Sequence, residues 1–74
     1  MRIYTVTFAI EDADPQEEVD KTWDEIAKAS RLLAHEVTAS DLPKAGGGGR
    51  RIRASERTRV FISPPIELPN ELVP

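Results

Sequence analysis

The chain of 74 residues contains no cysteine and only one histidine. Disulfide bonds are therefore excluded, and so is a zinc site built from Cys and His ligands. The absence of cysteine also fits a reducing compartment. A chain this short buries only about 60% of the surface that it exposes when unfolded. Its apolar burial then roughly balances the entropy lost on ordering. We therefore expect self-association, with a homodimer favoured, to supply the missing stability.

Long apolar runs are missing as well. No segment approaches the ~18 apolar residues of a membrane span. The first 15 residues lack both the apolar core and the small-residue cleavage site of a signal peptide. We expect a cytoplasmic protein that has no membrane partner.

Acidic and basic residues are separated along the chain, so that basic residues are scarce in one segment and acidic residues in another. Between residues 10 and 25 there are eight acidic residues and one basic residue, whereas between residues 47 and 62 there are five arginines and one glutamate. The formal net charge of −3 hides this separation. Global charge therefore says little about partners, and the arginine segment needs its own explanation.

Two regular elements are predicted in the first half of the chain. Residues 2–10 alternate, with Tyr4, Phe8 and other apolar side chains on one face, which is typical of a strand with one buried face. A helix is predicted over residues 15–36. Asp14 is its capping carboxylate, and Pro15 occupies its first position, where the missing N–H costs nothing.

The helix carries one apolar or small stripe at spacings of four and three residues. This periodicity predicts that the stripe faces the core. Its members are Val19, Trp23, Ile26, Ser30, Leu33 and Val37. Residues 35–40 permit two interpretations, a continuation of the helix or a short strand.

The second half of the chain contains every glycine in one run, Gly46 to Gly49. Residues 41–50 are predicted to be a loop. Residues 51–62 alternate again and predict one long strand, with Ile52, Val60 and similar residues facing the core and the arginines on the opposite face. Glu56 interrupts the apolar face, which suggests a bulge or an inward-pointing edge charge.

Residues 63–74 hold four of the six prolines and predict an extended proline-rich tail. Its apolar residues, Ile66 and Leu68 among them, indicate that it lies on its own domain or on a neighbouring subunit. Residues 1–62 then form a single α+β domain, a two-layer β-α-β unit with one helix on a two- or three-stranded sheet. A strand at residues 35–40 would make the order β-α-β-β. The helix could also connect two parallel strands.

The arginine face of residues 51–62 is the strongest functional feature. If the strand is continuous, Arg51, Arg53, Arg57 and Arg59 form a ribbon of roughly 27 Å. Three interpretations stay open: a solvated face that prevents aggregation, a contact with an acidic protein surface, or a nucleic-acid backbone. Phe61 shares this face, and aromatic residues for base stacking are otherwise scarce.

Other candidate sites are weaker. The glycine run lacks the G-K-[ST] ending of a phosphate-binding loop and precedes a strand, so it indicates a flexible connector. Glu11, Asp12 and Asp14 lack EF-hand spacing and are explained by helix capping, so we expect no metal. There is no serine in a G-x-S-x-G elbow and little room for a deep pocket, so we expect no enzyme activity.

In length and element order the chain is similar to dodecins, small flavin-binding shells. In that family the flavin-stacking tryptophan follows the helix, whereas Trp23 lies inside the predicted helix and residues 35–40 contain no aromatic residue. The difference falls on the functional residue, so we assign neither this family nor any cofactor.

These observations favour a small non-enzymatic protein–protein interaction module that self-associates. The arginine strand and the apolar tail are its expected contact surfaces. The alternative is a nucleic-acid-binding protein that uses the arginine strand. Trp23, Phe61, Ile66 and Leu68 are candidates for core or interface anchors.

Overall fold

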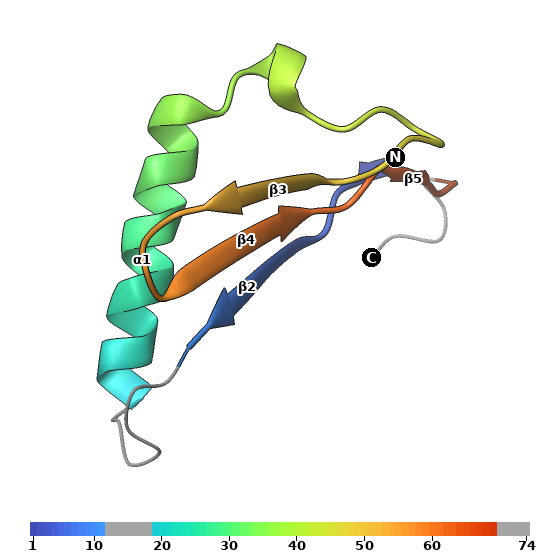
Figure 1. The fold of residues 1–74 in the computed structure, drawn as a ribbon. Coiled ribbons are helices and arrows are strands. Elements are labelled where there is room, and N and C mark those ends of the chain that lie inside the picture. Colours follow the sequence, from blue (N-terminus) through green and yellow to red (C-terminus); the bar gives the residue numbers. More distant parts are fainter. Residues whose placement is uncertain (12–18, 70–74) are drawn as a thin grey trace.

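The computed structural model describes residues 1–11 and 19–69. A three-stranded antiparallel sheet has the order β2 (Val6–Ile10), β4 (Thr58–Ile62) and β3 (Arg50–Arg53). The helix α1 (Val19–Glu36) packs across one face of this sheet (Figure 1). This confirms the predicted α+β class with two layers.

The expected long strand over residues 51–62 is wrong, because that segment is a hairpin. β3 and β4 pair with Arg53 opposite Arg59, and residues 54–57 form the turn. The side chain of Ser55 builds this turn: its Oγ accepts hydrogen bonds from the backbone N–H groups of Arg57 (3.3 Å) and Thr58 (3.1 Å). Glu56 therefore lies in the turn rather than at a bulge.

The hairpin gives the order β-α-β-β, the second of the predicted orders, with its additional strand at residues 50–53 rather than at residues 35–40. β2 and β3 are both antiparallel to β4, which lies between them. They therefore run in the same direction without being neighbours. α1 connects two strands of a split β-α-β unit rather than two adjacent parallel strands.

A second, two-stranded sheet joins the two ends of the described chain. β1 (Arg2–Ile3) pairs antiparallel with β5 (Ile66–Glu67), and the backbone N–H of Leu68 donates to the carbonyl of Met1 at 2.8 Å. Residues 63–69 of the tail thus lie on their own domain. The expected strand 2–10 breaks at residues 4–5. There β4 has ended, and Pro64 and Pro65 have no N–H to continue its ladder.

The core lies between α1 and the inner face of the three-stranded sheet. Ala29, Val60 and Ile62 are buried at its centre, and Phe8 and Leu33 pack against them. A side-chain hydrogen bond also joins the helix to the sheet. The hydroxyl of Thr58, which is fully buried, donates to Oε2 of Glu25 at 3.2 Å and so links β4 to α1.

The helix presents a different face to the core from the predicted one. Val19 and Trp23 are exposed by 82% and 67%, and Ser30 is also exposed. Ala29 is the buried helical residue, with Ile26 and Leu33 half-buried beside it. The predicted stripe is therefore wrong over its first turns, and Trp23 is not a core residue.

Residues 35–40 were expected either to continue the helix or to form a short strand, and the structure shows neither over the whole segment. α1 ends at Glu36, and a short 3-10 helix, η1 (Ala39–Asp41), follows after two residues. The predicted start of the helix, Asp14 and Pro15, lies outside the described residues. None of the helices among the described residues is long and apolar enough to cross a bilayer.

Candidate functional site

The candidate site is the face of the three-stranded sheet opposite α1, which we call the arginine face. Its strand register forms two rows: Thr7, Phe61 and Arg51 in one, and Ala9, Arg59 and Arg53 in the other. These residues border an open depression of about 580 Å³. Over β2 this face carries only the short side chains of Thr7 and Ala9, whereas long arginine side chains extend from β3 and β4.

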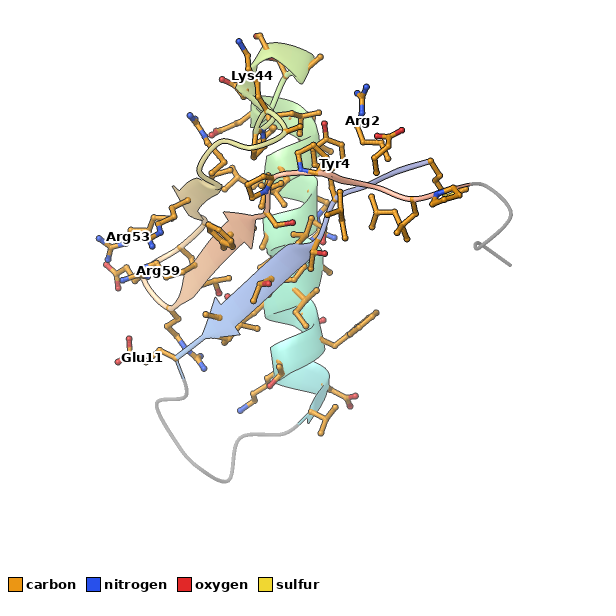
Figure 2. The ribbon with its side chains drawn as sticks, turned by 90° about the vertical axis from the view of Figure 1, so that its right-hand side faces the viewer. Arg2, Tyr4, Glu11, Lys44, Arg53 and Arg59 are labelled. Carbon is orange, nitrogen blue, oxygen red and sulfur yellow. The ribbon has the colours of Figure 1, made fainter. Side chains whose placement is uncertain are left out.

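The hairpin brings two arginines together that the continuous ribbon would have kept apart. Figure 2 shows Arg53 and Arg59 side by side, on the side of the sheet away from the helix. Both guanidinium groups bond to the hairpin turn. Arg53 Nε donates to the carbonyl of Ser55 at 3.4 Å, and Arg59 Nη1 donates to the carbonyls of Ser55 (3.3 Å) and Glu56 (3.1 Å).

Arg57 occupies a separate place. Its Nε donates to the backbone carbonyl of Glu11 at 2.8 Å, and the backbone N–H of Glu11 donates to the carbonyl of Arg57 at 2.8 Å. Arg57 is thus tied to the end of β2, where it lines a smaller hollow with Ala9 and Arg59 and does not border the larger depression. The predicted set of four arginines therefore becomes a group of three, and the expected 27 Å ribbon does not exist.

Phe61 is the aromatic residue of the arginine face, with 37% of its side chain exposed. Its ring lies over Gly49, where a Cβ would collide with the Cζ and Cε2 atoms of the ring and lie 2.7 Å from the carbonyl of Ile62. Gly49 therefore does more than connect elements, because its missing side chain leaves the space that the ring occupies.

The acidic residues that the structure describes lie mainly elsewhere. Asp20 and Asp24 belong to α1, which covers the opposite face of the sheet. Two residues are exceptions. Glu56 lies in the hairpin turn, where its backbone carbonyl accepts from Arg59, and Glu11 lies beyond Arg59 at the same end of the sheet (Figure 2). Between residues 1–11 and 19–69, no carboxylate lies within 4 Å of a guanidinium nitrogen of Arg51, Arg53 or Arg59.

A second hollow, of about 630 Å³, lies between the β1–β5 ribbon and residues 39–45. Arg2, Tyr4 and Lys44 are among its lining residues (Figure 2). Beside it, the backbone N–H and the hydroxyl of Thr38 both donate to Oδ2 of Asp41 at 3.0 Å. These bonds, the backbone one first, hold the pKa of Asp41 below its usual value, and Arg50 adds a smaller electrostatic effect.

The remaining predicted anchors are exposed or half-buried. Ile66 on β5 is 60% exposed, and Leu68 is half-buried beside the N-terminus. Trp23 lies on α1, away from the arginine face. Within the described part of the chain, no group of three or more His, Cys, Asp or Glu side chains is placed to hold a metal ion.

Sequence reasoning missed three contributors to this site. Gly49 seats the Phe61 ring, and Ser55 makes the turn that brings Arg53 beside Arg59. A lone serine between charged residues gives only a weak turn signal. Thr7 could have been included, because strand alternation places it on the outer face of residues 2–10.

No known protein family, curated protein or solved structure matches this chain.

Proposed function

We propose that this protein is a small non-enzymatic interaction module that self-associates through the open edge of β2. Its arginine face and its β5 tail then serve as contact surfaces for partners. One observation carries the self-association: the sequence of β2, VTFAI, contains no charged residue, whereas the other edge strand, β3, reads RRIR.

The hydrogen-bond register shows which groups of β2 face outward. Bonds join Ser63 to Thr5 and Glu11 to Arg57, so the odd-numbered residues of β2 bond to β4. The backbone N–H and C=O groups of Val6, Phe8 and Ile10 therefore point away from β4. In the described part of the chain, β2 pairs with no other strand.

A second copy fits this edge in an antiparallel arrangement about a twofold axis. With Phe8 opposite Phe8 of the second copy, Val6 lies opposite the second copy's Ile10, and all three residues exchange backbone hydrogen bonds. The cross-strand pairs are then apolar, and they cover Val6, which is 42% exposed in one copy. The result is one continuous six-stranded sheet.

The other surfaces of the sheet are less suited to a second copy. The free edge of β3 carries the backbone groups of Arg51 and Arg53, and paired copies would set arginines against arginines. Stacking two arginine faces would bring three guanidinium groups of each copy together. Like charges so placed repel, and the β2 edge avoids this contact.

Pairing through β2 keeps both arginine faces on the same side of the enlarged sheet, with both helices on the other side. The arginine face is then left for a partner of opposite charge. Ile66 and Trp23, each more than half exposed, are the further apolar contact surfaces.

Sedimentation velocity at tens of micromolar tests this proposal. We expect a dimer for the wild type and a monomer for Val6→Lys, because a charge on the edge strand opposes pairing. Ile66→Lys and Trp23→Lys are matched controls that add the same charge to exposed apolar positions elsewhere, and both should remain dimeric. Circular dichroism checks that each variant is folded.

A monomeric wild type at 50–100 μM (roughly the upper range of the assay) would overturn the proposal, because the small fold would then be stable without a second copy. Dissociation by Ile66→Lys instead of Val6→Lys would assign the contact to the β5 tail, and dissociation by Trp23→Lys would assign it to α1. Either result would refute the β2 edge as the interface.

A further inference from the structure

The arginine face joins two features that recur together in proteins that bind single strands of nucleic acid. Cationic side chains contact phosphates, and an aromatic side chain on a sheet offers its ring to a base. Here Arg59 and Phe61 are two residues apart on the central strand β4, with side chains on the same face about 6.7 Å apart along the strand.

The Arg53–Arg59 pair concentrates positive charge beside the hairpin turn. These residues lie directly opposite each other across β3 and β4, and like charges in that position destabilise a sheet. Their shared bonds to the Ser55 carbonyl hold both guanidinium groups at the turn yet use only some of the five N–H donors of each. A bound anion would take the remaining donors and relieve the repulsion.

Phe61 supplies the aromatic ring of the same face. Its ring is seated over Gly49, so it is held on the sheet rather than free to turn into solvent. Thr7, the neighbour of Phe61 on β2, is small and exposed, and Arg51 is its neighbour on β3. This arrangement leaves room above the ring for a flat group and sets a guanidinium beside it.

We infer that the arginine face binds single-stranded nucleic acid, with a phosphate between Arg53 and Arg59 and a base stacked on Phe61. The ring can reach a base only where that base is unstacked from its neighbours, which favours a single strand over a duplex. An acidic peptide would meet the arginines but would leave the ring without a stacking partner. The inference does not require the dimer, because every residue named lies in one copy.

Electrostatics supports this arrangement and also limits it. The described acidic residues of α1 lie behind the sheet, so they do not neutralise the arginine face. Glu11 at the Arg59 end and Glu56 in the hairpin turn both oppose a phosphate there. The Glu11→Gln variant should therefore bind an oligonucleotide more tightly than the wild type, most clearly at low salt.

Fluorescence anisotropy with a labelled dT12 oligonucleotide tests the inference on the full chain. With one phosphate between Arg53 and Arg59 and a second at Arg51, we expect the logarithm of the association constant to fall against the logarithm of salt concentration with a slope of about −1.4. In the Arg53→Gln/Arg59→Gln double variant the slope should fall to about −0.7. Arg31→Gln, which removes an exposed arginine of α1, is the matched control and should leave the slope unchanged.

The Phe61→Leu variant separates stacking from charge. It should weaken binding roughly fivefold to a hundredfold, the range for losing one base–aromatic stack, and leave the salt slope unchanged. Circular dichroism and the thermal midpoint show whether the variant is folded. Arg51→Gln is a second, milder variant that keeps the ring, and it should reduce the slope by about 0.7.

Several results would overturn the inference. One is no retention of dT12 by the wild type at about 20 mM salt, where phosphate contacts are strongest. Equal weakening by Arg31→Gln would show binding that is spread over the surface. Equal affinity for a poly-glutamate peptide would point to a protein partner, and an unchanged affinity in a folded Phe61→Leu variant would remove base stacking. The sedimentation assay is independent, so a failure here leaves the β2 edge proposal standing.

Discussion

The four consecutive glycines offer an alanine scan, because they differ in backbone conformation and in what an added Cβ would meet. At Gly49 an added methyl group would lie against the Phe61 ring and 2.7 Å from the carbonyl oxygen of Ile62. The ring can shift, but the carbonyl belongs to the central strand. Overpacking of this kind costs about 1–3 kcal/mol. In a domain of this size each 1 kcal/mol lowers the thermal midpoint by roughly 4–8 °C, so Gly49→Ala should melt at least about 4 °C lower.

Gly48 and Gly46 supply the controls within the same loop. Nothing lies within 4 Å of a Cβ built at Gly48, so Gly48→Ala should be neutral or raise the free energy of unfolding by about 0.4–1 kcal/mol through the unfolded state. Gly46 has φ 77°, where a side chain costs about 1–2 kcal/mol. Gly46→Ala should therefore destabilise the protein without affecting Phe61.

Thermal and urea unfolding followed by circular dichroism give the free energies of unfolding, and the proton chemical shifts of the Phe61 ring report its environment. Only Gly49→Ala should both destabilise the fold and shift the ring signals. Small and equal effects at all the positions would show that the run is a loose connector, and the reasoning that places Phe61 over Gly49 would be refuted.

Three other substitutions or titrations test the packing. Thr58→Val should lower the free energy of unfolding by about 1 kcal/mol, because the bond to Glu25 outweighs one added buried methyl group; unchanged stability in urea would contradict this bond. Val60→Ala, at a fully buried site, should cost about 2 kcal/mol in the same assay. The carboxyl group of Asp41 should titrate by NMR below the usual aspartate midpoint. Its contribution to stability is therefore present above about pH 4 and disappears as the pH falls through its lowered pKa. The Thr38→Val variant, which lacks the hydroxyl donor, should bring the midpoint closer to the usual value.

Alternation predicted much of the sheet, because it reports directly which side chains share a face. The pattern in residues 51–62 placed Val60 and Ile62 in the core, and Arg53 and Phe61 on the opposite face. Both assignments survive the hairpin, because a turn that keeps the alternation in phase leaves each side chain on its own face. The turn itself has no glycine or proline, and it depends on the Ser55 side chain and on two arginines that the sequence places apart.

In the helix, by contrast, the sequence pattern did not predict which face is buried. Trp23 is the largest apolar side chain on α1, and periodicity alone assigns it to the core. The structure instead buries Ala29 against Val60, with the Thr58–Glu25 bond beside them. A small residue allows the helix to approach the sheet closely, and this contact between layers is invisible in the pattern of a single element. Seating a ring over Gly49 likewise depends on two distant segments meeting.

Amide hydrogen exchange as a function of protein concentration tests the β2 edge most directly. The N–H groups of Val6, Phe8 and Ile10 face outward, whereas those of Thr7 and Ala9 bond to β4 and serve as internal controls. We predict that the three outward amides become protected as the concentration rises, in parallel with dimer formation, while the controls stay protected throughout. Rapid exchange of Val6, Phe8 and Ile10 in a sample that is dimeric by sedimentation would contradict the account.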